Sequence, residues 1–238
     1  NWRAADDEAR AANSEARAWC KRRIAERCLF GVDLNPTAVE LARVALWIES
    51  VAGDRPLSYF EHHIRPGNSL LGSWMARLEA PPLPQLSRRS PAAQRGLFQA
   101  EVRKVVEEAA RTRRMIDEIR PQDLRREGVE PESVREQEFK EALRRKADEI
   151  LAIAKLLFDL RSASAFVPPI WSDWDVLCGK CGSRDELTQY AAGRSWWPEF
   201  QAVRERERFF HWELEFPEIF LSQRAGFDAV LGNPPWDK

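Results

Sequence analysis

Apolar and polar positions follow three successive patterns near the start of the chain. Residues 3–27 are rich in Ala, Glu and Arg, with acids early and bases late, which is typical of a helix. The short apolar run 28–34 ("CLFGVDL") predicts a buried parallel strand that ends at an acid. Directly after it, Asn35 suits the cap of a helix and Pro36 its first turn. The predicted core-facing stripe of this helix consists of Ala38, Leu41, Ala42, Ala45 and Ile48. Strand, tight turn and helix together make half of a βαβ unit.

Two later segments predict further strands. The segment 60–72 ("FEHHIRPGNSLLG") contains a short strand ending near Arg65, followed by a Gly-Asn-Ser turn. The segment 226–233 ("GFDAVLGN") returns to a strand near 228–232. About 160 mostly helical residues separate these two strands, and a parallel sheet that carries a helical insertion explains that order.

Between these strands, the apolar positions of two long polar segments follow a heptad-like pattern. They recur at alternating steps of four and three, at Phe98, Val102, Val105, Ala109, Thr112, Ile116 and Ile119 in the first segment, and at Phe139, Leu143, Ala147, Ile150, Ala154, Leu157 and Arg161 in the second. Pro121, Gly128 and Pro131 break the pattern between them. We therefore predict an antiparallel helical hairpin whose other faces, dense in Arg, Lys and Glu, are solvated.

These elements predict a helix-rich α/β fold in which a long helical insertion interrupts a partial Rossmann-like sheet. Residues 1–80 would form the N-terminal part of the core. Residues 81–208 would form the mainly helical insertion, which opens on a proline-rich linker at 81–91. Residues 209–238 would return to the core.

Composition narrows the possible classes of protein. The 238 residues, 44% of them hydrophobic, can fill one sizeable core or two small ones. A net charge of −1 provides no overall basic field, so a nucleic-acid partner would need a local patch or a separate module. The sequence contains no apolar run of membrane-spanning length, no signal peptide and too few cysteines for a disulfide framework. We expect a cytoplasmic protein without a membrane partner.

The cysteines and histidines do not predict a metal site. The sequence "CGKC" (178–181) has metal-like spacing, but a tetrahedral zinc site needs two more ligands. Cys20 and Cys28 lie far away in the sequence, and the three histidines lie beside a predicted strand or among aromatic residues. We find no recognisable Ser/His/Asp arrangement and no P-loop.

The last predicted strand is followed by Asn233, Pro234, Pro235 and Trp236, and these four residues suggest a binding or catalytic site. A residue that precedes a proline is held extended, so the backbone cannot turn into a helix here and its carbonyls project from the end of the strand. In open α/β sheets that end faces the ligand crevice. The amide oxygen and the outward carbonyls could accept both hydrogens of an amino group, and the indole could stack on a flat ring. Methyl transfer to the exocyclic amine of a flipped base requires both interactions. A lone Pro-Pro-Trp is equally consistent with a rigid loop.

The NPPW sequence resembles the (N/D)PP(Y/F/W) motif of class I S-adenosylmethionine-dependent amino-methyltransferases, above all the DNA adenine-N6 enzymes. The segment 29–47 resembles their second motif, in which an acid at a strand end binds the ribose of the cofactor. The segment 62–72 resembles their third motif, which contacts the adenine of the cofactor. With "HWELEFPEIF" (211–220), the combination is similar to the large Eco57I-type restriction-modification methylases over residues 1–72 and 209–238.

The resemblance implies roles for single residues. For the cofactor, S-adenosylmethionine, it implies that Asp33 binds the ribose, that Leu34 packs on the adenine, and that Asn68 and Ser69 lie beside that ring. For the target, it implies that Asn233 and the Pro234 carbonyl accept from the amino group, that Pro235 shapes the turn and that Trp236 stacks on the flipped base. Asp33 alone could merely cap the helix that follows it.

The sequence departs from the family in two ways. Position 68 is Asn where many relatives carry Asp, and the glycine-rich first motif, which cradles the methionine part of the cofactor, is absent. We therefore expect a fragment of a DNA adenine-N6 methyltransferase of restriction-modification or phage defence, inactive alone and reaching duplex DNA through a recognition domain outside these residues. The alternatives are an amino-methyltransferase of ribosomal RNA or protein glutamine, and a non-catalytic helical interaction module.

Overall fold

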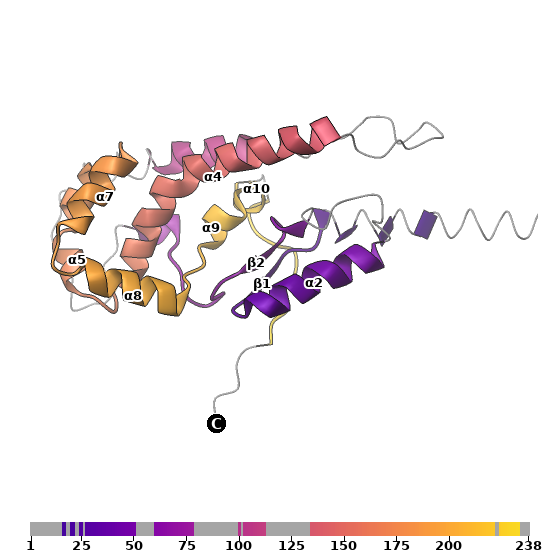
Figure 1. Cartoon of the computed structure of the whole chain (residues 1–238), viewed down its shortest axis with the longest axis horizontal. Coiled ribbons are helices and arrows are strands. Elements are labelled where there is room, and N and C mark those ends of the chain that lie inside the picture. The colour runs from indigo at the N-terminus through magenta and orange to yellow at the C-terminus, as the bar shows by residue number, and fades with distance from the viewer. Residues whose placement is uncertain are drawn as a thin grey trace, which may run out of the picture. The chain divides into compact units, whose positions relative to one another are not determined.

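The structure is a computed structural model (Figure 1). It describes residues 16–17, 20–21, 24–25, 27–50, 60–78, 100, 102–112, 134–221 and 224–233, with the backbone alone for 134–141. The chain divides into two compact units: Asn1–Leu70 with Asp123–Gln137, and Leu71–Gln122 with Glu138–Lys238. The division into 1–80, 81–208 and 209–238 and the antiparallel course of the helical hairpin stay predictions. None of the helices in the described ranges is long and apolar enough to cross a membrane.

The first unit contains a two-stranded parallel sheet and one long helix. Strand β1 (Gly31–Asp33) pairs with β2 (Ile64–Pro66), and Gly31, Val32 and Asp33 lie opposite Ile64, Arg65 and Pro66. Helix α2 (Pro36–Glu49) follows β1 after a short turn, as predicted (Figure 1). The described positions between 16 and 27 are helical. The α/β character and the parallel pairing are therefore confirmed.

The turn between β1 and α2 is held by side chains of its own residues. The Asn35 side chain accepts the backbone N–H of Thr37 at 3.0 Å and caps the helix, and Pro36 occupies the first turn, where no backbone donor is needed. One oxygen of Asp33 accepts the backbone N–H of Asn35 at 2.7 Å. The chain thus reverses from strand to helix within two residues, and its local hydrogen bonds are satisfied.

The covered face of α2 differs from the predicted stripe. Leu41 and Ile48 are 65% and 63% exposed, whereas Val39 is 1% exposed. The half-buried Arg43 explains the rotation, because its Nε and Nη2 donate to the Ile64 carbonyl at 3.0 and 2.7 Å. The helix therefore turns the face that carries Arg43 toward β2. The hydrogen bonds to the strand carbonyl stabilise this orientation more than burial of the more apolar stripe would.

The described part of the second unit is mostly helical. Its elements are the 3-10 turn η2 (Met75–Arg77), a helix over 102–112, most of α4 (Val134–Ala163), α5 (Pro169–Ser172), α6 (Trp174–Gly179), α7 (Arg184–Ala192), α8 (Trp197–Glu207), α9 (Trp212–Glu215) and α10 (Pro217–Phe220). Helices α5, α7 and α8 gather around one end of α4 (Figure 1). One core cluster joins α4 to the 102–112 helix and to these shorter helices.

The packing of α4 against the 102–112 helix follows much of the predicted seam. Val102, Ala109, Ala147, Ala154 and Leu157 are all buried, as the heptad-like pattern requires. The neighbouring positions Val106 and Leu151 are buried more fully than the predicted Val105 and Ile150, which are half-buried. A straight helix advances 3.6 rather than 3.5 residues per turn, so its buried face drifts off a strict heptad.

The predicted third strand near 228–232 is wrong. Residues 227–233 form no strand, and Val230 and Leu231 are 74% and 98% exposed. An apolar run becomes a parallel strand only where a neighbouring strand supplies hydrogen bonds and a packed layer covers it. The described residues provide neither for this segment, so the sheet that they form has two strands rather than three.

Within the second unit, residues 71–73 lie directly against residues 209–211. The Phe210 N–H donates to the Leu71 carbonyl at 2.8 Å. A Cβ at Gly72 would lie 2.0 Å from the Phe210 carbonyl oxygen, which is backbone and has little freedom to move. Glycine at position 72 therefore permits the close approach of the two chain segments.

We predict that Gly72→Ala lowers the free energy of unfolding by about 3 kcal/mol or more. The added Cβ would clash with backbone atoms, which cannot move aside as a flexible side chain can, so the loss lies at or above the usual range for overpacking. Urea unfolding followed by circular dichroism measures the loss. Gly182→Ala is the matched control, since a Cβ there meets nothing within 4 Å. Equal stability of the two variants would contradict the close approach.

Candidate functional site

The four residues expected to bind the cofactor lie at one edge of the first unit. Asp33 ends β1 opposite Pro66, which ends β2, and the Gly67 N–H donates to the Asp33 carbonyl at 2.9 Å. Leu34 follows Asp33, and Asn68 and Ser69 follow Gly67. Because the two strands are parallel, the structure brings these residues to the same carboxyl edge, where ligands bind in open α/β sheets.

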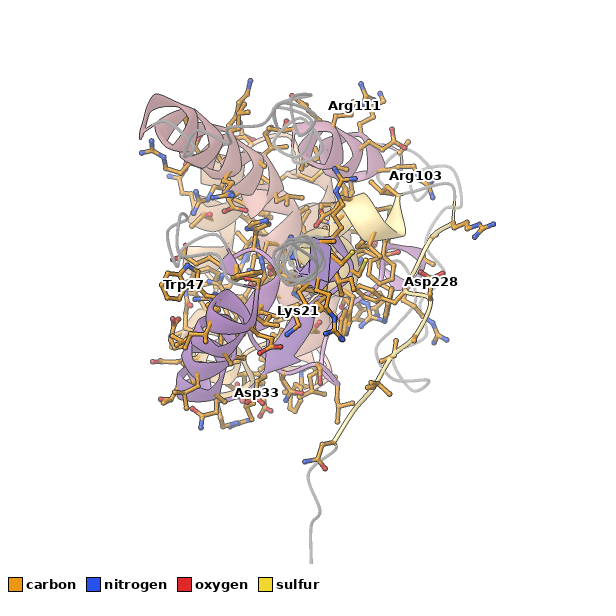
Figure 2. All side chains as sticks on the ribbon, turned by 90° about the vertical axis from the view of Figure 1, so that its right-hand side faces the viewer. Lys21, Asp33, Trp47, Arg103, Arg111 and Asp228 are labelled. Atoms are coloured by element: carbon orange, nitrogen blue, oxygen red, sulfur yellow. The ribbon has the colours of Figure 1, made fainter. Side chains whose placement is uncertain are left out.

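The carboxylate of Asp33 has one oxygen engaged and one available. Oδ1 accepts the Asn35 N–H, whereas Oδ2 has no hydrogen bond within the described ranges. The side chain is exposed at the end of β1 (Figure 2). The capping role and a ligand-binding role are therefore compatible, since the turn fixes the carboxylate and leaves its second oxygen as an acceptor.

Asn68 presents the opposite hydrogen-bonding capacity. Its Oδ1 accepts the Leu70 N–H at 3.2 Å, which leaves its NH₂ group as a donor. Leu34 is 52% exposed, and its apolar side chain is available at the same edge. Ser69 is exposed as well. The edge thus offers an acceptor, a donor and an apolar side chain.

The segment that leads to Asn233 is anchored by a phenylalanine in the second unit. The ring of Phe227 lies edge-on to those of Trp212, Phe216 and Phe220, with centroids 5.7–6.0 Å apart. The preceding Gly226 has a φ of 110°, a conformation that favours glycine. Its N–H donates to the Ile219 carbonyl at 3.4 Å. The chain is therefore fixed at 226–227.

Beyond this anchor the segment is exposed. Asp228 and the residues through Asn233 face solvent (Figure 2). The other three predicted target-side residues, Pro234, Pro235 and Trp236, lie outside the described residues. The structure therefore shows how the chain leading into the NPPW segment is held. The roles of the four NPPW residues stay predictions.

A buried polar network, which the sequence did not suggest, lies in the second unit. His211 is 0% exposed, and its Nδ1 accepts the Ser73 N–H at 3.0 Å. Its Nε2 lies 2.9 Å from Asp159 Oδ1, and Arg204 Nε lies 2.7 Å from Asp159 Oδ2. Because Nδ1 must be an acceptor, the proton sits on Nε2 and is donated to Asp159.

This network is structural rather than catalytic. A catalytic dyad needs the second imidazole nitrogen free to take a proton from a nucleophile, and here that nitrogen faces a backbone N–H. The hydroxyl of Ser73 is itself hydrogen-bonded to that of Ser162 at 2.7 Å. The network fixes the 209–216 segment against α4 and α8. One local feature could have drawn attention to Asp159: it is an acid within the otherwise apolar stretch 156–160 ("LLFDL") of α4.

Two glutamates hold the same segment on its other side. Glu213 accepts the Met75 N–H at 2.5 Å, and Glu215 pairs with Lys155 of α4. Burial raises the pKa of Glu213 above 4.5, although the Met75 N–H and the charge of Arg103 oppose the shift. The "HWELE" segment is thus an anchor whose acids have structural partners.

The described ranges contain no group of three or more His, Cys, Asp or Glu side chains placed to hold a metal ion. The "CGKC" pair lies in the second unit, where Cys178 and Cys181 are half-buried. Among the described residues, the candidate site consists of the hydrogen-bonding groups at the β1–β2 edge and, separately, the anchored segment that leads to Asn233.

The family model described as "Eco57I restriction-modification methylase" matches residues 27–238. No curated protein and no solved structure matches the chain. The match begins just before β1 and includes both the carboxyl edge and the NPPW segment.

We predict that Glu213→Gln reduces the pH dependence of stability. With its pKa raised, folded wild-type Glu213 binds more protons than the unfolded chain, so the free energy of unfolding falls as pH rises from about 4.5 toward neutrality. Glutamine keeps an acceptor for Met75 and does not titrate. Urea unfolding at pH 4 and pH 7 should show the variant gaining relative to wild type at the higher pH.

Glu49→Gln is the matched control for this measurement. A hydrogen bond and the charge of Lys21 lower the pKa of Glu49, so its contribution has the opposite sign and is lost as pH falls. Parallel pH trends in the two variants would contradict the assignment for Glu213.

We predict that Asp159→Ala lowers the free energy of unfolding by about 3–5 kcal/mol, because it leaves the buried imidazole N–H without an acceptor and removes the partner of Arg204. Asp159→Asn should cost less, since an amide oxygen can still accept from His211. Chemical unfolding measures both. Glu149→Ala, at an exposed position of the same helix, should change stability by less than about 0.5 kcal/mol. A neutral Asp159→Ala would show that the network does not stabilise the fold.

Proposed function

Because the chain belongs to the Eco57I restriction-modification methylase family, we propose that it is part of a site-specific DNA adenine-N6 methyltransferase that uses S-adenosylmethionine. The family match establishes the methylase class and implies DNA as the substrate. The carboxyl edge of β1 and β2 is the observation that carries the proposal for the cofactor. The anchored segment ending at Asn233 carries the proposal for the target base.

The residues at the β1–β2 edge fit the nucleoside part of the cofactor. Asp33 Oδ2 would accept from a ribose hydroxyl, while Oδ1 keeps the carboxylate aligned through Asn35. The NH₂ group of Asn68 would donate to a ring nitrogen of the adenine, and Leu34 would pack on its face. An aspartate at position 68 could only accept, so the asparagine changes which edge atom of the adenine is read.

S-adenosylmethionine supplies an electrophilic methyl group when bound. In the proposal, Asn233 Oδ1 and the Pro234 carbonyl accept the two N–H groups of the target amine and orient its lone pair. Trp236 stacks on the flipped base, and Pro235 keeps the backbone extended. None of these groups must gain or lose a proton in order to bind the amine. The chain's contribution is therefore positioning and electrostatic stabilisation.

The Phe227 anchor supports this assignment. Positioning within a fraction of an ångström requires that the supporting residues be fixed, and a loosely held segment loses much of that contribution. Three aromatic rings hold Phe227 six residues before Asn233. The exposed stretch between them is short and leaves Asn233 accessible to a base that has left the duplex.

We predict that, in the full-length protein that contains this chain, Asn233→Ala lowers kcat about 10²–10³-fold, the typical effect of removing a preorganised hydrogen-bonding group. Cofactor affinity should stay unchanged. Asp33→Asn should instead raise the Kd for S-adenosylmethionine about tenfold, because the amide keeps the turn and removes the charged acceptor. Transfer of labelled methyl groups and equilibrium dialysis measure the two effects. This chain alone should bind weakly and not turn over.

Asp228→Asn, at an exposed acid of the second unit, is the control and should change neither quantity. Adenine-containing duplex DNA, ribosomal RNA and protein should be offered in parallel. Methylation of RNA or protein alone would replace DNA as the substrate. Cofactor binding without any transfer to the three would favour a non-catalytic module. Full activity of Asn233→Ala would overturn the proposed target site.

A further inference from the structure

The "CGKC" sequence has no part in the proposed methyl transfer. Cys178 is the second-to-last residue of α6, and Cys181 lies in the turn that leads to α7. The Cys181 N–H donates to the Cys178 carbonyl at 3.3 Å, and the Lys180 N–H donates to the Leu177 carbonyl at 3.1 Å. The two cysteines are therefore the first and fourth residues of a tight hydrogen-bonded turn.

This turn holds the two cysteines at disulfide-forming separation. A hydrogen-bonded turn keeps the Cα atoms of its first and fourth residues within about 7 Å. Disulfides form at Cα separations of about 4.4–6.8 Å. Cys178 and Cys181 are in the thiol form in the structure. Bond formation therefore needs side-chain rotation and a small adjustment of the turn, and no rearrangement of the helices.

The surroundings leave room for that adjustment. A Cβ at Gly179 or at Gly182 would meet nothing within 4 Å, so the backbone beside each cysteine borders open space. Both cysteines are half-buried and pack against the core cluster of the second unit. A small solute can thus reach the turn from its outer side. Packing against the core on the inner side keeps both cysteines in place.

We propose that Cys178 and Cys181 form a reversible dithiol–disulfide site that exchanges with low-molecular-weight disulfides such as oxidised glutathione. The thiolate of one cysteine attacks a sulfur of the external disulfide and releases one small thiolate, which takes up a proton. The thiolate of the other cysteine then attacks the mixed disulfide and releases the second small thiol. The net reaction oxidises two protein thiols to one disulfide and reduces one external disulfide to two thiols.

Such a bond would be redox-labile rather than a structural brace. A disulfide stabilises a fold mainly by closing a long loop in the unfolded chain, and the loop between Cys178 and Cys181 spans only four residues. The energetic gain is correspondingly small, so the bond would respond to the thiol–disulfide balance of its surroundings. Zinc is the competing interpretation, and the described ranges offer no group of three ligands around this pair.

The chain itself offers a direct test. A Cys20→Ser/Cys28→Ser background leaves Cys178 and Cys181 as its only thiols. This protein is equilibrated in glutathione buffers of increasing oxidised fraction, quenched with acid and digested with trypsin. Trypsin cleaves after Lys180, between the two cysteines, so mass spectrometry finds the flanking peptides joined only when the disulfide is present.

We expect the intact mass to fall by two hydrogen atoms and the joined peptides to increase from a small minority to nearly all of the protein across the buffer series. Dithiothreitol should reverse both changes. Cys178→Ser and Cys181→Ser in the same background should each retain a single glutathione and give no joined peptides. Circular dichroism checks that these variants fold, and the background protein carries the conclusion if they do not.

Three outcomes would overturn the proposal. The thiols could stay reduced in every buffer, or stable glutathione adducts could accumulate without joined peptides. Zinc alone could bind with one ion per chain and protect both thiols from alkylation, which would make the pair part of a metal site instead.

Discussion

The candidate site depends on the parallel pairing of β1 with β2. Parallel strands bring their carboxyl ends to one edge, so residues thirty or more positions apart in the sequence become neighbours. Arg43 reinforces this pairing from α2, since its guanidinium donates to the Ile64 carbonyl within β2 and to the Glu61 carbonyl just before it. One half-buried side chain therefore ties α2 to β2 and to the turn before it. The positions of Asp33 and Asn68 follow from that arrangement.

In the second unit, the segment 209–216 has a comparable organising role. It meets residues 71–75 backbone to backbone, and Gly72 makes that approach possible. His211 and Glu213 accept backbone N–H groups from Ser73 and Met75, and Glu215 pairs with α4. The same segment supplies Trp212 and Phe216 to the cage around Phe227. The anchor of the NPPW segment thus rests on a part of the chain that is itself held by charged and backbone contacts.

Local signals in the sequence predicted local structure well. The apolar run before Asp33, the Asn35 cap and Pro36 gave the first strand, the turn and the helix, because these features depend on neighbouring residues. The heptad-like spacing gave much of the buried face of α4 and of the 102–112 helix, because such a face follows from helical periodicity. Features that depend on distant partners were missed. The buried side of α2 is decided by a carbonyl in β2, and the 228–232 run has the composition of a strand without a strand beside it. His211 and Asp159 meet across 52 residues of sequence, which no local pattern encodes.

Titratable groups brace the 209–216 segment, whereas the groups proposed to hold the target amine do not ionise. Acids and a histidine with buried or partly buried partners, such as Asp159, Glu213 and His211, brace the 209–216 segment. The groups proposed to hold the target amine are an amide and backbone carbonyls, which do not ionise. Burial raises the pKa of Glu213, so a change in its protonation acts on this brace, whereas the proposed acceptors are unaffected. Glu213 therefore links pH to the stability of the segment that anchors Phe227, while the proposed binding of the amine depends on the geometry of uncharged groups.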